Sequence, residues 1–318
     1  MQYRFTLQPY AGMASRYTCP RCNARKTFTR YIDTQTGQHL GPAVGCCNRL
    51  INCGYHYKPK QFFADHGSLP ADYGMRQSSI VTRPLFVNRA PSFISNAIVY
   101  QSLGSLAPNN FVTYLTGLFG AEITAQLAGR YYIGTARHWP GATVFWQVDD
   151  NQNVRTGKIM LYNPDTGKRI KEPRNYITWA HCLLKQPSFN LQQCLFGQHL
   201  LKGNTQPVAI VESEKTAVIA SIYLPKFIWL ATGSLSNLNP KKCQALKGRN
   251  VTLFPDLNAY DKWRQAAYKL YPITRYYISD LLERRATPLQ RQQGLDLADC
   301  LVQFDYREFL EGVGKEHN

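Results

Sequence analysis

The sequence predicts an α/β protein, α+β overall, in which a cysteine-rich β module and a basic β-rich middle region precede a carboxyl-terminal, mainly parallel sheet. Three observations predict this order. Closely spaced cysteines gather near the amino terminus, alternating apolar and polar runs fill the middle, and short β-branched runs that end in carboxylates follow residue 204. The predicted parts are residues 1–66 (cysteine-rich module), 67–109 (linker), 110–204 (helical and β-rich basic region), 205–305 (parallel-sheet domain) and 306–318 (tail).

The cysteine motifs predict a zinc ribbon in the amino-terminal module. CPRC (residues 19–22) is followed by adjacent cysteines at 46–47 and by CGYH (residues 53–56). Two short turns that present thiolates in this way can hold one tetrahedral zinc ion, and four protein ligands leave no open position, so the expected role is structural. The alternative is a set of unpaired buried cysteines. The preferred ligands are Cys19, Cys22, Cys47 and Cys53, with His56 as the alternative fourth ligand and Cys46 as a spare thiol.

Basic residues interleaved with aromatic residues surround these motifs. On a small β surface, cationic side chains contact phosphates and aromatic rings stack on bases, which suits single-stranded DNA. An ordinary solvated basic face is the alternative. The candidate contacts in the module are Arg21, Arg25, Lys26, Arg30 and Arg49.

The charge distribution also favours a nucleic-acid partner. The chain carries 37 Lys and Arg against 20 Asp and Glu, a net charge of +17. Residues 1–121 hold twelve basic residues and three acidic ones, whereas twelve of the twenty acids follow residue 204. A basic surface that leads to a small acidic centre is typical of proteins that handle a polyanion with metal ions.

Two carboxylates in the carboxyl-terminal third end β-branched runs. Glu212 follows VAIV in VAIVESEKTA, and Asp256 follows NVTLFP. The carboxyl ends of neighbouring parallel strands meet at one edge of a sheet, and hard divalent cations take oxygen ligands, so this edge is a candidate magnesium site. Asp296 and Asp299 are three residues apart and would share one face of a helix turn. For any single acid, an exposed loop position or a helix cap is the alternative.

The surrounding residues predict the other elements. Further strands are expected at 227–231 and 273–278, and a helix is expected to start at Asn239 and Pro240. Glu214 and Lys215 are expected to be solvated residues of a first helical turn, with contact of Lys215 to a phosphate as the alternative. Upstream, an amphipathic helix pair is predicted at 111–131 and a basic hairpin or meander at 142–173, which contains Arg155 and Lys158.

The stretch from about Pro207 to Phe304 resembles a Toprim domain. This Rossmann-like fold is shared by bacterial-type DNA primases, type IA and II topoisomerases and OLD-family nucleases. VESEKTA resembles the family motif V-E-G-x-x-D-A at Glu212, with Ser213 and Thr216 in place of the glycine and the aspartate.

The other two acidic motifs are matched unevenly. The family's D-x-D pair is matched only at Asp256, because Asn258 offers an oxygen without a charge. Asp296 and Asp299 resemble the later D-x-x-D of primases. The order of zinc ribbon, basic sheet and Toprim-like fold resembles primase-type proteins of bacterial mobile elements.

The resemblance implies magnesium-dependent nucleotidyl transfer, that is, primer synthesis on single-stranded DNA from nucleoside triphosphates. It implies that Glu212 and Asp256 are catalytic, and that Arg155 and Lys158 hold template or nucleotide phosphates. The implied magnesium ligands are Glu212, Asp256, Asn258, Asp296 and Asp299. A nuclease of the same fold, or an inactive DNA-binding accessory protein of replication, is the alternative, and Asn258 favours the accessory protein.

The sequence also bears on location and partners. MQYRFTLQPY lacks an apolar signal region, and no run approaches the roughly 20 apolar residues that span a bilayer. An odd number of cysteines, nine, favours a reducing cytoplasm over a disulfide framework. No P-loop motif occurs, so any unwinding is expected from a separate helicase.

Overall fold

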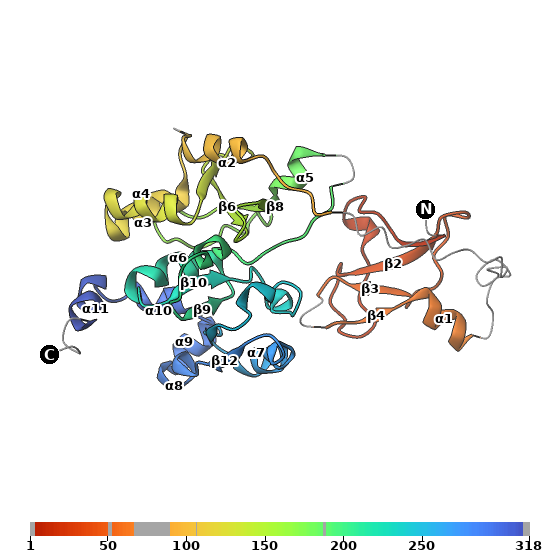
Figure 1. Cartoon of the computed structure of the whole chain (residues 1–318). Coiled ribbons are helices and arrows are strands. Elements are labelled where there is room, and N and C mark those ends of the chain that lie inside the picture. Colours follow the sequence, from red (N-terminus) through yellow and green to blue (C-terminus); the bar gives the residue numbers. More distant parts are fainter. Residues whose placement is uncertain (1–3, 50–52, 67–89, 106, 187–188, 314–318) are drawn as a thin grey trace. The chain divides into compact units, whose positions relative to one another are not determined.

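The computed structural model describes residues 4–49, 53–66, 90–105, 107–186 and 189–313, which fall into two compact units, 1–87 and 88–318 (Figure 1). Most of the predicted linker, residues 67–89, lies outside the described residues. No helix within the described ranges is both long enough and apolar enough to pass through a membrane.

The amino-terminal unit is a small antiparallel sheet. Its elements are β1 (Phe5–Leu7), the 3-10 turn η1 (Met13–Ser15), β2 (Phe28–Asp33), β3 (Gly45–Cys47), β4 (His56–Tyr57) and helix α1 (Pro59–Asp65). The strands follow the sheet order β1-β2-β3-β4. Phe28, Cys19 and Cys47 are fully buried and form its small core. So few buried side chains make this unit dependent on another source of stability.

The second unit begins with helices that pack on an antiparallel sheet of order β5-β6-β7-β8. The elements are α2 (Asn96–Leu103), α3 (Asn110–Phe119), α4 (Ala121–Arg130), β5 (Ile133–Ala136), β6 (Ala142–Val148), β7 (Val154–Met160), β8 (Ile177–Trp179) and α5 (Ala180–Leu184). The predicted helix pair and meander are confirmed. Helix α2 lies within the predicted linker; the Ser95 hydroxyl caps it, and Val99 is buried.

A parallel sheet of order β10-β9-β11-β12 forms the rest of this unit. It contains η3 (Gln198–Leu201), β9 (Val208–Val211), α6 (Glu214–Tyr223), β10 (Ile228–Ala231), η4 (Leu235–Asn237), η5 (Gln244–Leu246), β11 (Asn250–Leu253), α7 (Tyr260–Ala267), η6 (Tyr268–Leu270) and β12 (Arg275–Ile278). The short helices α8 (Leu281–Arg285), α9 (Pro288–Gln293), α10 (Leu297–Leu301) and α11 (Tyr306–Val313) follow. The predicted α/β fold with a parallel sheet is therefore confirmed.

Two local predictions differ from the structure. Asn239 and Pro240 begin a turn and the 3-10 segment η5 instead of an α-helix, because Gly248, with a φ of +75°, soon turns the chain toward β11. Residues 306–313 of the predicted tail form helix α11, in which Tyr306 packs on Phe119 of α3 with ring centroids 5.4 Å apart. This aromatic contact packs α11 against α3 at the edge of the hydrophobic core.

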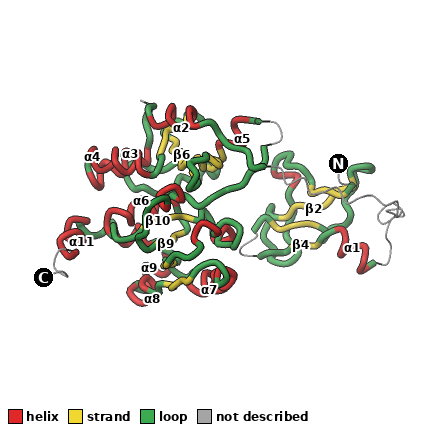
Figure 2. Tube along the Cα trace, in the orientation of Figure 1, coloured by secondary structure: helices red, strands yellow, loops and turns green. Residues whose placement is uncertain are grey.

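The parallel strands are buried on both faces. Ala209 and Val211 of β9 join a core that contains α6 and Phe145 of the antiparallel sheet. Val208 and Ile210 point the opposite way, into a core with Trp263. Helix α6 lies between the two sheets (Figures 1 and 2). Successive side chains of a strand point to opposite faces, so one strand contributes to both cores.

Candidate functional site

The four preferred cysteines of the amino-terminal unit converge. Cys19 and Cys22 lie in the turn before β2, Cys47 ends β3, and Cys53 precedes β4. Their sulfur atoms all lie within 4.8 Å of one another, with 3.7 Å between Cys19 and Cys53 and 4.0 Å between Cys22 and Cys47. Zinc–sulfur bonds of about 2.3 Å in a tetrahedron place sulfurs about 3.8 Å apart, so the four thiolates are positioned for one structural zinc ion.

His56, the alternative fourth ligand, and Cys46, the expected spare thiol, both lie outside this quartet. His56 Nε2 hydrogen-bonds the Tyr31 hydroxyl at 2.9 Å, and Cys46 Sγ faces the Cys47 carbonyl oxygen at 3.7 Å. A hydrogen bond from the Ala24 backbone lowers the pKa of the Cys22 thiol to about 7 against the effect of burial. Burial raises the pKa of the Cys53 thiol to about 11. Cys22 therefore loses its proton more easily than Cys53 and offers a thiolate to the metal more readily.

The predicted DNA-contacting residues of this unit lie at its surface. Arg21, Arg25, Lys26 and Arg49 are exposed, whereas Arg30 is half-buried with its guanidinium 3.9 Å from the centre of the Tyr17 ring. Arg21 also donates to the Cys53 carbonyl oxygen at 3.1 Å. Their contact with nucleic acid stays a prediction.

The parallel sheet brings Glu212 and Asp256 to its carboxyl edge. Glu212 directly follows β9, and Asp256 lies three residues beyond the end of the neighbouring strand β11. Burial raises the pKa of Glu212, and the Glu214 carboxylate adds to this rise while Lys158 opposes it. Both acids therefore lie where ligands bind in open parallel sheets.

The Asp256 carboxylate has no hydrogen-bond donor and no ion pair within the described part of the chain. Burial raises its pKa to about 7, with Asp296, Glu212 and Asp299 as further causes. A half-buried carboxylate among other carboxylates, with no donor of its own, is suited to a cation.

Asn258 faces a different part of the molecule. Its φ is 65°, in the left-handed region that asparagine tolerates. Its side-chain amide donates to the Arg291 carbonyl oxygen at 2.7 Å, and its backbone N–H donates to Glu283 Oε1 at 2.8 Å. These bonds tie Asn258 to helices α8 and α9, and its role as a magnesium ligand stays a prediction.

The prediction that Glu214 and Lys215 are solvated is wrong. Glu214 is 1% exposed and Lys215 is 8% exposed, because α6 is apolar on all sides and its first turn is enclosed between the two sheets. Glu214 accepts two hydrogen bonds from Lys158 Nζ, at 3.0 and 3.2 Å. Lys158 also donates to the Gly233 carbonyl oxygen at 3.2 Å. The first turn of α6 is thus part of the site and not a free surface.

Gly233 is required beside this ion pair. Its φ is +76°, and a Cβ atom there would lie 3.0 Å from Glu214 Oε1. The Gly233 N–H donates to the Glu212 carbonyl oxygen at 2.8 Å. The other predicted phosphate contact on β7, Arg155, is bonded to Asp149 Oδ2 at 2.7 Å. In this structure the charges of Arg155 and Lys158 are both paired with acids.

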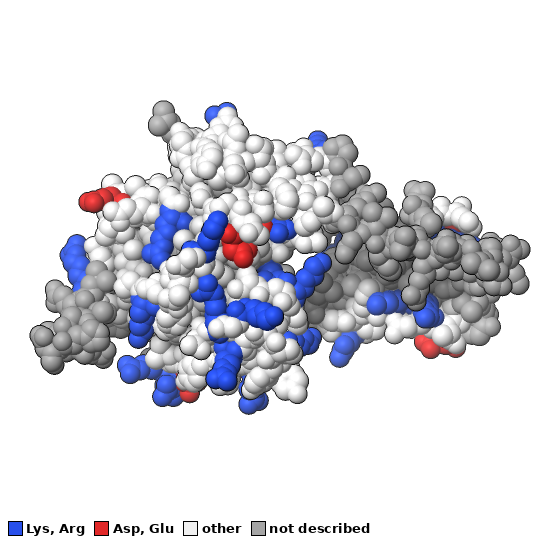
Figure 3. All heavy atoms as spheres, viewed as in Figure 1, with Lys and Arg blue, Asp and Glu red and all other residues white. Residues whose placement is uncertain are grey.

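A cavity of about 800 Å³ opens beside the acids. Asp256, Asp296 and Asp299 line one part of it, together with Lys215. The turn that follows β7 lines another part and supplies Lys168, Arg169 and Lys171. These three residues lie within the predicted basic meander of residues 142–173, where sequence reasoning did not single them out. The signal that could have selected them is their density in TGKRIK, directly after a turn. Figure 3 shows Lys and Arg spread over the visible face, with Asp and Glu at few places.

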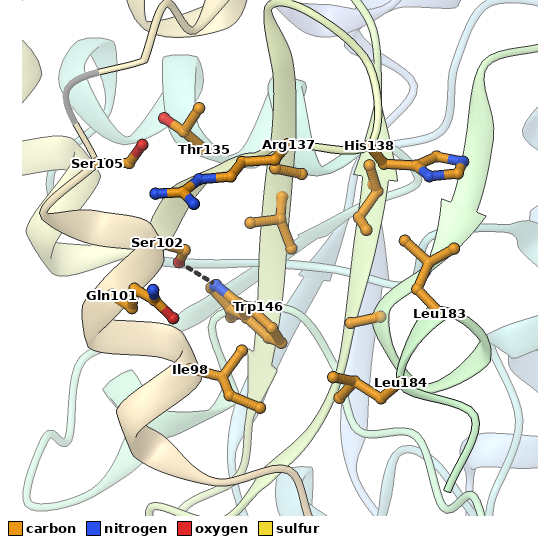
Figure 4. A pocket seen from close by; sticks show the side chains of 14 residues that line it. Ile98, Gln101, Ser102, Ser105, Thr135, Arg137, His138, Trp146, Leu183 and Leu184 are labelled. Carbon is orange, nitrogen blue, oxygen red and sulfur yellow. Dashed lines mark hydrogen bonds between the residues drawn. The ribbon is translucent and has the colours of Figure 1, made fainter.

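A second cavity, of about 240 Å³, lies on the other face of the antiparallel sheet (Figure 4). Ile159 lines this cavity, whereas its neighbour Met160 lines the acidic one. Trp146 Nε1 donates to Ser102 Oγ at 2.9 Å and joins α2 to the sheet. This cavity is mainly apolar, and the acid site does not include it.

Comparisons with known families find two matches along the chain. Residues 3–68 match a zinc beta-ribbon finger family, and residues 109–257 match a domain of unknown function, DUF6371. No curated protein matches the chain.

The chain is also similar in structure to primase fragments. The primase fragment of the bacteriophage T7 primase-helicase protein aligns with a TM-score of 0.41 and 14% identity over 94% of this chain and 98% of the other. The zinc-binding and RNA polymerase domains of Aquifex aeolicus primase align with a TM-score of 0.36 and 12% identity over 96% and 79%.

We expect replacement of a zinc-site cysteine to release the metal. Cys22→Ser or Cys53→Ser should reduce the zinc content from one ion per chain to near zero and unfold the ribbon, because a module with so small a core folds around its metal. Zinc content by mass spectrometry and far-UV circular dichroism measure this. Cys46→Ser is the matched control and should keep its zinc. Loss of zinc in this variant would show that Cys46 is one of the four ligands.

We expect the Lys158–Glu214 pair to behave as a buried ion pair. Lys158→Met should lower the free energy of unfolding by about 3–5 kcal/mol, because it leaves the Glu214 carboxylate buried without a counter-charge. The double variant Lys158→Met/Glu214→Gln should recover much of that loss. Urea denaturation measures both, with the exposed Lys262→Met as the control. Equal stability of the single and double variants would contradict a buried pair.

We expect the stability of the metal-free protein to fall with pH because of Asp256. Its carboxyl binds a proton more tightly in the folded than in the unfolded chain, so its contribution is present at low pH and is lost as pH rises through about 7. Between pH values of roughly 5 and 8, the melting temperature of the native protein should fall more steeply than that of Asp256→Asn. At the higher pH, magnesium should restore the melting temperature of the native protein. Equal slopes would show that Asp256 does not titrate in this range.

Proposed function

We propose that the chain is a primase-like protein that binds single-stranded DNA and synthesises primers by magnesium-dependent nucleotidyl transfer. The observation that carries this proposal is the unpartnered Asp256 carboxylate, next to Glu212 at the carboxyl edge of the parallel sheet. The basic turn after β7, which lines the same cavity of about 800 Å³ as Asp256, also supports the proposal.

The donor set fits magnesium. Glu212 and Asp256 offer carboxylate oxygens, the ligands that this ion prefers, and one or two carboxylates with several waters are its usual coordination. Bound there, magnesium would neutralise charge on phosphates and hold them in line for transfer. Asn258, Asp296 and Asp299 are the further predicted ligands.

The cavity fits a polyanionic substrate. Lys168 and Lys171 are exposed and Arg169 is half-buried, and all three line a space of about 800 Å³ next to the acids. Cations on one wall hold phosphates, while metal-binding acids on another bring the reacting atoms together. The zinc ribbon, with its exposed arginines, suits a separate contact with the template strand. Any unwinding of a duplex would come from a separate helicase.

Two other functions use the same residues. A nuclease would use the acids to activate water, and would cut DNA without nucleoside triphosphates. A DNA-binding accessory protein would need no active metal site. The bonds of Asn258 to α8 and α9 favour this alternative, because they give its amide nitrogen and its backbone N–H a structural role.

Primer synthesis on single-stranded DNA with labelled nucleoside triphosphates and magnesium tests the proposal. Glu212→Gln and Asp256→Asn should each reduce labelled product by about 10²- to 10³-fold, the effect of losing one preorganised charge-stabilising group. Asp261→Asn, an exposed acid at the start of α7, is the control and should keep full activity.

The outcomes separate the three functions. Product that is lost in both variants supports a primase. DNA cleavage without nucleoside triphosphates, lost in the same variants, would replace it by a nuclease. Template binding without product in the native protein or in either variant would leave an accessory protein.

A further inference from the structure

Asp296 and Asp299 are bonded to each other through the start of helix α10. Asp296 Oδ1 accepts a hydrogen bond from the Asp299 backbone N–H at 2.9 Å, and Asp299 Oδ2 accepts one from the Asp296 backbone N–H at 3.3 Å. This is a reciprocal capping box. One oxygen of each carboxylate is therefore committed to the helix.

The remaining two oxygens face α6. Lys215 Nζ lies 2.9 Å from Asp299 Oδ1 and 3.7 Å from Asp296 Oδ2. The Thr216 hydroxyl donates to Asp296 Oδ2 at 2.8 Å. All four carboxylate oxygens of the pair thus have a donor on this chain.

Lys215 is enclosed by the two acids in this position. The Asp296 and Asp299 carboxylates, at 3.7 and 2.9 Å from Nζ, stabilise its positive charge. Its side chain is 10% exposed, so water screens the ion pairs little. A divalent ion at Asp296 and Asp299 would have to displace this ammonium or share the two carboxylates with it at close range.

The other side of the acid cluster is different. The Asp256 carboxylate has no hydrogen-bond donor among the described residues. The Glu212 carboxylate accepts a hydrogen bond from the Leu235 backbone. Asn258 brings no charge. The unneutralised charge of the site is thus concentrated on Glu212 and Asp256, away from the pair that Lys215 occupies.

We infer that Lys215 is a built-in cation that takes the place of a second divalent ion, so that the site binds one magnesium, at Glu212 and Asp256. This inference rests on the proposed metal site of the preceding subsection. It assigns Asp296 and Asp299 to the positioning of Lys215 and α10. Glu212 and Lys215 are three residues apart in VESEK, so one short segment carries both a metal ligand and the substitute for a second metal.

Manganese is a suitable probe, because electron paramagnetic resonance reports the free ion and so counts the bound ions on the zinc-loaded, full-length chain. The native protein should bind one manganese per chain. Lys215→Met keeps the length and the apolar stem of the side chain and removes its charge; it should bind two. Lys171→Met removes a charge from the same cavity and should still bind one, which controls for a general change in electrostatic potential.

The outcomes separate this inference from the proposed function. One manganese in both the native protein and Lys215→Met, or two in the native protein, would overturn the inference and leave the metal site in place. No bound manganese, or one that Asp256→Asn does not remove, would overturn both.

A second variant does not depend on the folding of Lys215→Met. Asp299→Asn in the native background should still bind one manganese, because Asp299 is not a ligand in this arrangement. Loss of that ion would overturn the inference.

Discussion

The buried ion pair between Lys158 and Glu214 joins the antiparallel sheet to the parallel sheet at the edge where the acids lie. Lys158 is on β7, Glu214 is in the first turn of α6, and the same ammonium holds the carbonyl of Gly233 after β10. Two charges leave water at this depth only when they meet each other. The positions of Glu212 and of the glycine loop relative to β7 therefore depend on this pair.

Charge balance decides what each acid at this edge can do. Asp296 and Asp299 are neutralised in part by Lys215 and bonded into α10, so they are structural partners of α6. Asp256 lies near them but receives no donor, and its raised pKa results from burial and from their proximity. Aspartates at this edge thus differ in their surroundings, because Lys215 forms ion pairs with Asp296 and Asp299 and, among the described residues, none with Asp256.

The amino-terminal unit is stabilised in another way. Phe28 and two of the cysteines form its central cluster, and few other apolar side chains, such as Val44 and Phe63, are buried, which is little apolar surface for independent folding. Four convergent thiolates supply the missing stability if they hold zinc, since the binding free energy of a structural metal is folding free energy. The exposed arginines on this unit can then be presented on a rigid surface without a large core beneath them.

The zinc quartet, the parallel direction of the carboxyl-terminal strands and the position of Glu212 and Asp256 at strand ends could be predicted from the sequence, because cysteine spacing and strand-end position are local properties of the chain. The sequence did not determine which charges pair. Lys158 and Glu214 are 56 residues apart, and Lys215 and Asp299 are 84 apart. Whether a lysine faces a carboxylate, a cavity or water depends on how the two sheets enclose α6. These charge pairings become visible only in the tertiary structure, because they arise from long-range packing.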